Sequence, residues 1–170
     1  LAEDEEWEIV NSVIDEAIVN IKKFRQDEGR ILAEDLLLRV SNIELYLKGI
    51  EPFEAQRLDR IKERLRKNME EFAVKQQVDQ NRYEQEILYY IEKLDINEEK
   101  VRLGQHCNYF REEMKGADEQ KGRKLSFIAQ EMGREINTIG AKANDSDVQQ
   151  CVVMMKDELE KLKEQLSNIL

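Results

Sequence analysis

Apolar residues recur every three or four positions along most of the chain, which is the spacing that gathers side chains on one face of an α-helix. Two such series occupy the first 50 residues, and Gly29 lies between them. They comprise Trp7, Val10, Ile14, Ala17, Ile21 and Phe24, followed by Leu32, Leu36, Val40, Ile43, Leu47 and Ile50. The pattern predicts one helix that ends near Glu28 and a second helix that packs against it.

The same spacing predicts four further helices between residues 52 and 140. Pro52 suits the first turn of the next helix, because its missing N–H would have no partner there. The apolar faces are Leu58, Ile61, Leu65, Met69 and Phe72; Tyr83, Ile87, Tyr90 and Leu94; Leu103, Cys107, Phe110 and Met114; and Leu125, Ile128, Met132, Ile136 and Ile139. We expect a loop over 115–121 and an end to the last of these helices near Gly140.

The final helix is predicted by a stretch of N-cap residues, 144–147, that precedes an unbroken apolar stripe. The stripe consists of Val148, Val152, Met155, Leu159, Leu162, Leu166 and Ile169. Such a coiled-coil-like face needs a partner. We expect an antiparallel hairpin within the same chain, with a contact between subunits as the alternative.

These elements predict an all-α fold, because no strand pattern is found. Apolar residues become sparse in a Gln-rich stretch around 75–81. We therefore expect a helical arm or set of hairpins over 1–80, followed by a C-terminal helical domain over 81–170. The C-terminal domain carries the densest polar motifs.

Charge narrows the partners that the whole molecule can attract. The chain has 37 acidic and 27 basic residues among 170, a formal net charge of −10. Any polyanion must therefore bind a local basic patch. No apolar run approaches 18 residues, so we expect a cytoplasmic protein without membrane contact, and we interpret Cys107 and Cys151 as reduced. Without a Gly-rich phosphate loop, no small organic cofactor is expected.

One candidate site lies on the predicted helix that begins near Asp95. Glu99, Arg102 and His106 fall in one narrow sector of that helix, with Glu98 at its margin. Carboxylates can hold a divalent cation, histidine can bind metal or move a proton, and arginine can bind a phosphate. The alternative is a solvated face with an ion pair between Glu98 and Arg102.

A second candidate site lies on the helix that follows. Its polar residues are Arg123, Lys124, Gln130, Glu131, Arg134, Glu135, Asn137 and Lys142. Amides and arginine can recognise nucleotides or phosphates, while the carboxylates can hold a metal or act as general bases. The alternative is an ordinary amphipathic helix.

A third candidate is a basic stripe at helical spacing, formed by Arg57, Arg60, Arg64 and Lys67. A stripe of this kind can follow a phosphate backbone. Asp59 and Glu63 interrupt it, so ion pairing within the chain is an equal alternative.

Several of these motifs together resemble a bacterial family. They are Glu28-Gly29, 95–106, 122–127, 130–140, 142–145 and 156–168. The chain resembles the YicC/YloC-like proteins over essentially its whole length, except that Ser126, Gly133, Ala141 and Ser167 replace the usual Asp, Asn, Ser and Gln. The family has a further N-terminal domain, so we expect this chain to correspond to its C-terminal portion.

The resemblance implies a divalent-metal-dependent endoribonuclease that cleaves single-stranded RNA, including small regulatory RNAs, and a ring-like hexamer that clamps RNA. From side-chain chemistry we predict Mg²⁺ or Mn²⁺ at Glu98, Glu99, Glu131 and Glu135, catalysis by Glu99, His106, Glu131 and Glu135, and RNA contacts by Arg102, Arg123, Lys124, Gln130, Arg134, Asn137, Lys142, Arg57, Arg60 and Arg64. Two alternatives remain: a non-catalytic RNA-binding scaffold, and a metal-independent nuclease that relies on His106.

Overall fold

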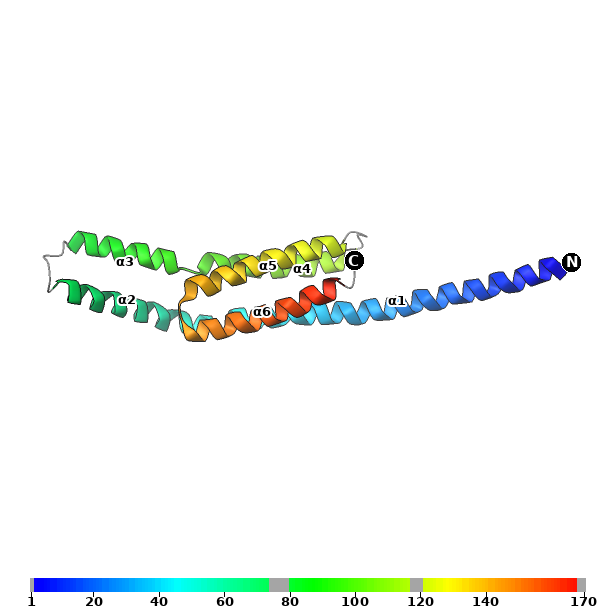
Figure 1. The fold of residues 1–170 in the computed structure, drawn as a ribbon, viewed down its shortest axis with the longest axis horizontal. Helices are drawn as coiled ribbons and strands as arrows, with labels where there is room; N and C mark the ends of the chain where they lie inside the picture. The colour runs from blue at the N-terminus through cyan, green and yellow to red at the C-terminus, as the bar shows by residue number, and fades with distance from the viewer. Residues whose placement is uncertain (1, 74–79, 117–120, 168–170) are drawn as a thin grey trace. The chain divides into compact units, whose positions relative to one another are not determined.

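The computed structural model describes residues 2–73, 80–116 and 121–167, and within them every regular element is a helix (Figure 1). The helices are α1 (Ala2–Lys48), α2 (Glu51–Ala73), α3 (Gln80–Leu94), α4 (Asn97–Lys115), α5 (Lys121–Ala143) and α6 (Ser146–Ser167). The all-α prediction is confirmed. Most of the predicted boundary segment, 75–81, lies outside the described residues. None of the helices in the described ranges is long and apolar enough to cross a lipid bilayer.

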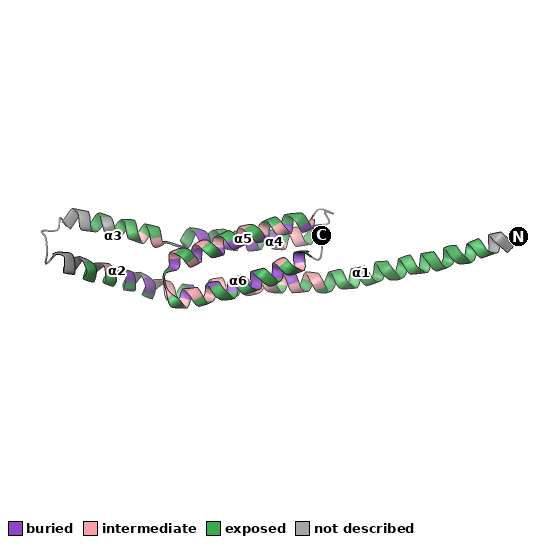
Figure 2. Ribbon diagram, viewed as in Figure 1, coloured by how far each residue is buried: buried purple, intermediate pink, exposed green. Residues whose placement is uncertain are grey.

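The prediction of two paired helices before residue 50 is wrong, because α1 continues through Gly29 to Lys48. A glycine inside a helix costs only about 1 kcal/mol relative to alanine, which the strong helix formers around it can offset. Arg30 and Glu34 add an ion pair of 3.3 Å across the next turn. The predicted apolar face is consequently exposed, with Trp7 at 64% and Phe24 at 62% (Figure 2).

The chain divides into two compact units, 1–37 and 38–170. This division differs from the boundary near residue 80 that the sequence indicated. The last part of α1 belongs with the C-terminal helices, because Arg111 of α4 lies 2.6 Å from Glu44 and 2.9 Å from Ser41. A local drop in apolar density cannot show such contacts between distant segments.

In the second unit, α5 packs against both α4 and α6. The fully buried side chains of these helices form most of its core: Leu103, Cys107, Phe110, Leu125, Ala129, Met132, Ile136, Ile139, Val148, Val152, Met155, Leu159, Leu162 and Leu166. The described part of the predicted stripe on α6 is therefore buried within the chain, as expected. Ile169 lies outside the described residues.

Two glycines allow α5 and α6 to approach closely. A Cβ atom at Gly133 would lie 3.2 Å from Leu159 Cδ2, and one at Gly140 would lie 3.1 Å from Val152 Cγ1. Both distances are shorter than ordinary carbon–carbon contact. A side chain at either position would require the facing side chain, Leu159 or Val152, to move.

The turn between α5 and α6 uses the N-cap residues that the sequence indicated. Asn144 adopts a positive φ of 45°, a conformation that asparagine tolerates better than most residues. Asp145 Oδ1 then accepts hydrogen bonds from the backbone N–H groups of Asp147 at 3.1 Å and Val148 at 3.2 Å. Asp145 thereby caps the start of α6.

A buried carboxylate joins α6 to the end of α1. Glu158 is 5% exposed and accepts hydrogen bonds from Arg39 at 3.2 Å, Asn42 at 2.9 Å and Lys161 at 3.1 Å. Burial alone would raise the pKa of Glu158, but the three donors and the charge of Lys161 outweigh it and lower that pKa. Glu158 is therefore held in its charged form.

The two cysteines are free, as predicted. Cys107 is fully buried, and burial, supported by the charge of Glu44, raises its pKa to about 12. Cys151 is half-buried, and burial raises its pKa as well. Neither thiol therefore has the lowered pKa that marks a reactive cysteine.

Candidate functional site

A buried arginine organises the place where α2, α3 and α5 meet. Arg57 is 3% exposed and donates hydrogen bonds to the backbone carbonyls of Ala143 at 2.6 Å, Lys142 at 3.1 Å and Leu94. These carbonyls lie at the C-terminal ends of α5 and α3, where helical partners are missing. Burial lowers the pKa of Arg57, and the nearby charge of Glu54 partly offsets this. The prediction that Arg57 belongs to an exposed basic stripe is wrong, since its donors are used inside the fold.

Beside Arg57, a lysine of α5 pairs with a buried carboxylate of α4. Lys142 Nζ lies 2.6 Å from Glu99 Oε1, and Glu99 is 5% exposed. The second oxygen, Oε2, is buried and has no hydrogen-bond partner among the described residues. The sequence placed Glu99 and Lys142 in separate candidate sites, and the packing of α4 against α5 brings them together.

A cleft of about 260 Å³ opens next to this junction. Its lining consists of Arg57, Arg60, Ile61, Arg64, Asn144, Asp145 and Ser146. Arg60 Nη2 lies 2.5 Å from Asp145 Oδ2, so its charge is partly neutralised. Arg64 is exposed and forms no ion pair with any described residue. The cleft thus combines three guanidinium groups with one carboxylate at its wall.

Arg60 and Arg64 also line a second, more open hollow of about 600 Å³ along α2, together with Asp59, Glu63, Lys67 and Asn68. Lys67 lies 3.8 Å from Glu63. Hydrogen bonding and charge from Arg66 lower the pKa of the exposed Glu63 carboxyl. The basic stripe is therefore interrupted by ion pairs, and Arg64 is its clearest unpaired cation.

The motif on α4 does not form one exposed face. Glu98 and Arg102 form an exposed ion pair of 2.5 Å, which was the alternative interpretation of this motif. His106 is half-buried, and its ring meets that of Tyr109 edge-on at 6.3 Å. Glu99 lies apart from this pair, buried against Lys142.

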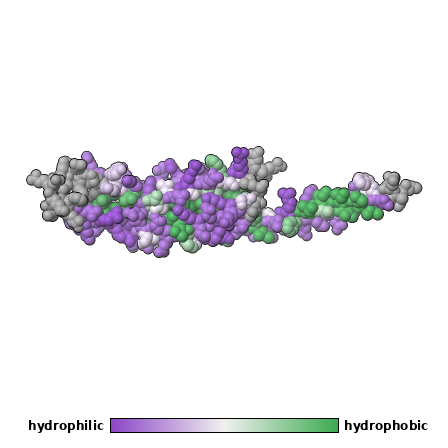
Figure 3. Space-filling model, viewed as in Figure 1, coloured by the Kyte–Doolittle hydropathy of each residue, from purple (hydrophilic) through white to green (hydrophobic). Residues whose placement is uncertain are grey.

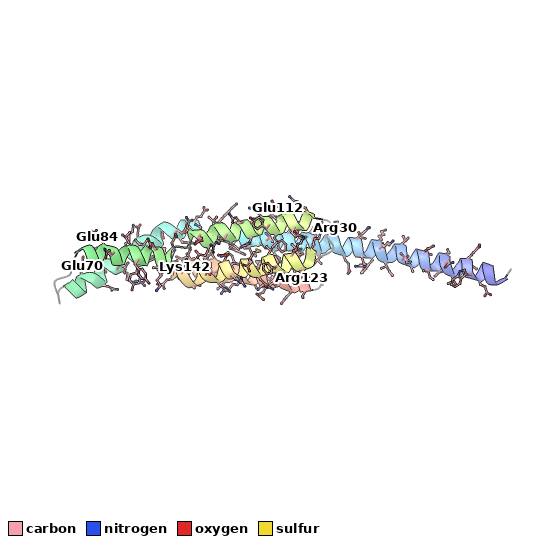
Figure 4. The ribbon with its side chains drawn as sticks, turned by 90° about the horizontal axis from the view of Figure 1, so that it is seen from above. Arg30, Glu70, Glu84, Glu112, Arg123 and Lys142 are labelled. Carbon is pink, nitrogen blue, oxygen red and sulfur yellow. The ribbon has the colours of Figure 1, made fainter. Side chains whose placement is uncertain are left out.

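The polar residues of α5 are spread over the length of the helix. Arg134 Nη1 lies 2.8 Å from Glu131 Oε1 without hydrogen-bond geometry. Glu135 is half-buried, while Gln130 and Asn137 are exposed. Figure 4 shows Arg123 and Lys142 at opposite ends of α5. At 1.5 Å per residue these two positions are about 29 Å apart, too far for one small site.

A third hollow, of about 430 Å³, lies at the Arg123 end of α5. It is lined by Glu113, Arg123, Lys124, Phe127 and Ile128. Lys124 Nζ lies 3.5 Å from Glu113 Oε1. Phe127 is 64% exposed, although the residue is large and apolar.

The predicted metal ligands do not converge. Across 2–73, 80–116 and 121–167, no group of three or more His, Cys, Asp or Glu side chains is placed to hold a metal ion. Glu98 and Glu131 each lie beside an arginine, and Glu99 lies beside a lysine. These residues do not by themselves fit a Mg²⁺ or Mn²⁺ ion.

Sequence reasoning missed several residues that shape this region. The sequence marked Asp145 as a helix cap and as part of the polar motif over 142–145, but not its pairing with Arg60, which is 85 residues earlier in the chain. Lys100 pairs with Glu54, which is 46 residues earlier in the chain, at 2.5 Å. Helical periodicity reports which face a residue occupies and not which distant residue it meets. The polar run 144–147 was the one feature of the sequence that pointed to this region.

Comparison with known proteins agrees with the motifs. Residues 50–170 match the family model described as "Endoribonuclease YicC-like, C-terminal". A protein named probable endoribonuclease YicC from Clostridioides difficile is 35% identical over 170 residues, which cover 98% of this chain and 58% of that protein. A protein of the same name from Haemophilus influenzae is 27% identical over 158 residues, covering 93% and 54% respectively.

The chain therefore spans a little more than half the length of these curated relatives. The family model covers most of the chain, from α2 through the junction and α6. Every side chain of the cleft at the junction lies inside the matched region. The chain accordingly belongs to the YicC-like endoribonuclease family, of which it carries the C-terminal domain.

Proposed function

We propose that this chain is the C-terminal part of an endoribonuclease that cleaves single-stranded RNA. Its membership of the YicC-like family carries the proposal, since two relatives are named probable endoribonucleases. The basic residues around the cleft support it, because an acidic protein needs a local cationic surface to hold a polyanion. Activity is proposed for the full-length protein, of which this chain is one part.

The cleft beside the junction is the surface that we assign to RNA phosphates. Arg64 is exposed without an ion pair to the described residues, and Arg60 reaches the same cleft from one turn away. Arginine can bind a phosphate through two parallel hydrogen bonds. Asp145 already accepts a bond from Arg60, so a phosphate at this position would compete with that carboxylate.

Proton transfer is assigned to His106. It is the only histidine of the chain, it is half-buried, and it lies one turn after Arg102 on α4. Cleavage of RNA needs one group to accept a proton from the attacking hydroxyl and one to give a proton to the leaving oxygen. Histidine serves both roles near neutral pH.

Dependence on Mg²⁺ or Mn²⁺ remains a prediction. Because the carboxylates in the described part of the chain do not converge, an ion would need further ligands such as RNA phosphates or groups from the rest of the protein. Glu99, Glu131 and Glu135 are the half-buried or buried carboxylates that we retain as candidates. Cleavage measured with Mn²⁺ and with EDTA separates the metal-dependent reaction from one that uses His106 alone.

The test uses full-length protein and a labelled single-stranded RNA. We expect Arg64→Ala to weaken binding and to lower the slope of log Kd against log salt by about one, as for the loss of one phosphate contact. His106→Gln should lower kcat while Kd and the melting temperature stay unchanged. Arg66→Ala is the matched control, since Arg66 already pairs with Glu63 and Glu70 on the same helix.

Absence of cleavage by the wild-type protein, with or without metal, would overturn the enzyme assignment. RNA binding that persists without cleavage would favour the second candidate function, a non-catalytic RNA-binding scaffold. The observation that favours this alternative is the pairing of Glu98, Glu99 and Glu131 with basic side chains. In that case Glu99→Gln would lower the melting temperature, while the folded variant would bind RNA with the Kd of wild type.

We also propose that the protein forms a homo-oligomer, as the family resemblance implies. Support comes from the unit over 1–37, where the apolar side chains of α1 are exposed along the helix (Figure 3). Exposed apolar surfaces of this kind commonly mark contacts between proteins. Light scattering of full-length protein tests the proposal. We expect Ile14→Glu to reduce the mass of the assembly.

A further inference from the structure

An exposed aromatic ring stands between two cations at the start of α5. Phe127 follows Arg123 by four residues and Lys124 by three, so all three share one side of the helix. Phe127 is 64% exposed, and the hollow beside it is also lined by Ile128. The ring of Phe127 is therefore open to a partner that approaches from solvent.

The charges around the ring favour an anionic occupant. Arg123 is exposed and forms no ion pair with the described residues. Among the described residues, Glu113 is the one carboxylate that lines the hollow, and Lys124 lies 3.5 Å from it. Lys121, one turn before Leu125, donates to the carbonyls of Met114 at 3.2 Å and Gly116 at 3.0 Å, which ties the start of α5 to the end of α4.

We propose that this hollow is a second RNA subsite, an inference that rests on the proposed function. In it Phe127 stacks on an unpaired base and Arg123 binds the neighbouring phosphate. An aromatic face accepts any base, and a nearby cation neutralises the backbone. A paired base would not expose its face to the ring, so the subsite selects single-stranded RNA. Asp118 and Glu119 lie in the connecting segment outside the described residues.

This subsite is distinct from the cleft at the junction. Arg123 and Lys142 lie at opposite ends of α5, about 29 Å apart along the helix axis (Figure 4). A stacked strand rises 3.4 Å per nucleotide, so about nine nucleotides would be needed to reach from one end to the other. The subsite therefore holds RNA at a distance from the cleft at the junction.

The experiment measures Kd, KM and kcat of full-length protein with a single-stranded RNA of 20 nucleotides and with the same sequence as a duplex. We expect Phe127→Ala to raise Kd and KM for the single strand roughly tenfold, the effect of losing one stacked base, while kcat and the duplex Kd stay unchanged. Phe127→Tyr should keep the wild-type Kd, and Phe127→Leu should not. Tyr89→Ala, which removes another exposed aromatic ring, is the control and should have no effect.

Three results would overturn the subsite. They are an unchanged Kd for Phe127→Ala when wild-type protein still cleaves RNA, full recovery by Phe127→Leu, and a changed oligomeric mass of Phe127→Ala. The first two would show that stacking contributes nothing, and the third would make Phe127 a subunit contact. Failure of wild-type protein to bind RNA would instead overturn the proposed function, and this subsite with it.

Discussion

Arg57 shows how one side chain can replace solvent at the ends of two helices. Its guanidinium donates to backbone carbonyls of Leu94, Lys142 and Ala143, and little of it is exposed. A buried carbonyl without a donor costs about 1–3 kcal/mol, so the residue removes several such penalties at once. It contributes to the fold of the junction, whereas Arg64 remains available to solvent.

Replacing Arg57 should therefore affect stability and not RNA contact. We expect Arg57→Ala to lower the free energy of unfolding by about 2–4 kcal/mol, because carbonyls at two helix ends lose their donor. Urea unfolding followed by circular dichroism measures the change. Arg57→Lys should recover only part of it, since one ammonium cannot reproduce the planar set of donors. Arg64→Ala should unfold like wild type, and equal destabilisation by both variants would contradict this assignment.

Glu158 gives stability a dependence on pH. Its pKa is lowered in the folded protein, so the stabilisation is complete above the ordinary glutamate pKa of 4.5 and is lost as pH falls through the lower folded value. We expect the melting temperature of wild type to fall below pH 4.5 more steeply than that of Glu158→Gln. Thermal unfolding between pH 7 and pH 3 measures this, with the exposed Glu160→Gln as control. Parallel curves for wild type and Glu158→Gln would contradict the prediction.

At the scale of the elements, α5 and α6 depend on glycine for their spacing. A side chain at Gly140 would meet Val152, whereas nothing lies within 4 Å of a Cβ atom at Gly104 in α4. We expect Gly140→Val to destabilise by about 1–3 kcal/mol through overpacking. Gly104→Ala should stabilise by roughly 0.5–1 kcal/mol, because alanine is the better helix former. Both changes are measured by urea unfolding, and a neutral Gly140→Val would show that the helices can separate freely.

The sequence predicted the helices best where helix-start residues and the apolar periodicity agreed. Pro52 and the polar run 144–147 mark the starts of α2 and α6 correctly. Gly29 was misread as a helix end, because the cost of one internal glycine is small compared with the gain from a long run of helix formers. Propensity alone could not decide between a break and a continuous helix.

Several residues of the candidate site were singled out in the sequence, but the contacts between them were not. Glu99 and Lys142 were both singled out, but their 2.6 Å contact depends on how α4 packs against α5. Arg57 and Arg64 look alike in sequence, although one is buried and the other exposed. Their difference arises from the helix ends that surround Arg57, which a periodic pattern does not encode.

At the scale of the whole molecule, charge and apolar surface are divided unevenly between the two units. The unit over 38–170 buries a core between α4, α5 and α6, although single apolar residues such as Phe127 stay exposed, and it presents ion pairs to solvent. The unit over 1–37 instead exposes large apolar residues, which the proposed oligomer would cover. We therefore expect the second unit to fold without burial of the apolar face of the first unit.

The only tryptophan, Trp7, lies on that exposed apolar face. Its fluorescence at low protein concentration should resemble that of free indole in water. It should stay nearly constant while urea unfolds the helices over 38–170. Assembly should shift the emission to shorter wavelength as the ring leaves solvent, which a dilution series measures against light scattering. A change in Trp7 emission that follows the unfolding of the helices over 38–170 would contradict this prediction. On this expectation Trp7 is an intrinsic optical probe that would report the proposed association and would not respond to unfolding of the helices over 38–170.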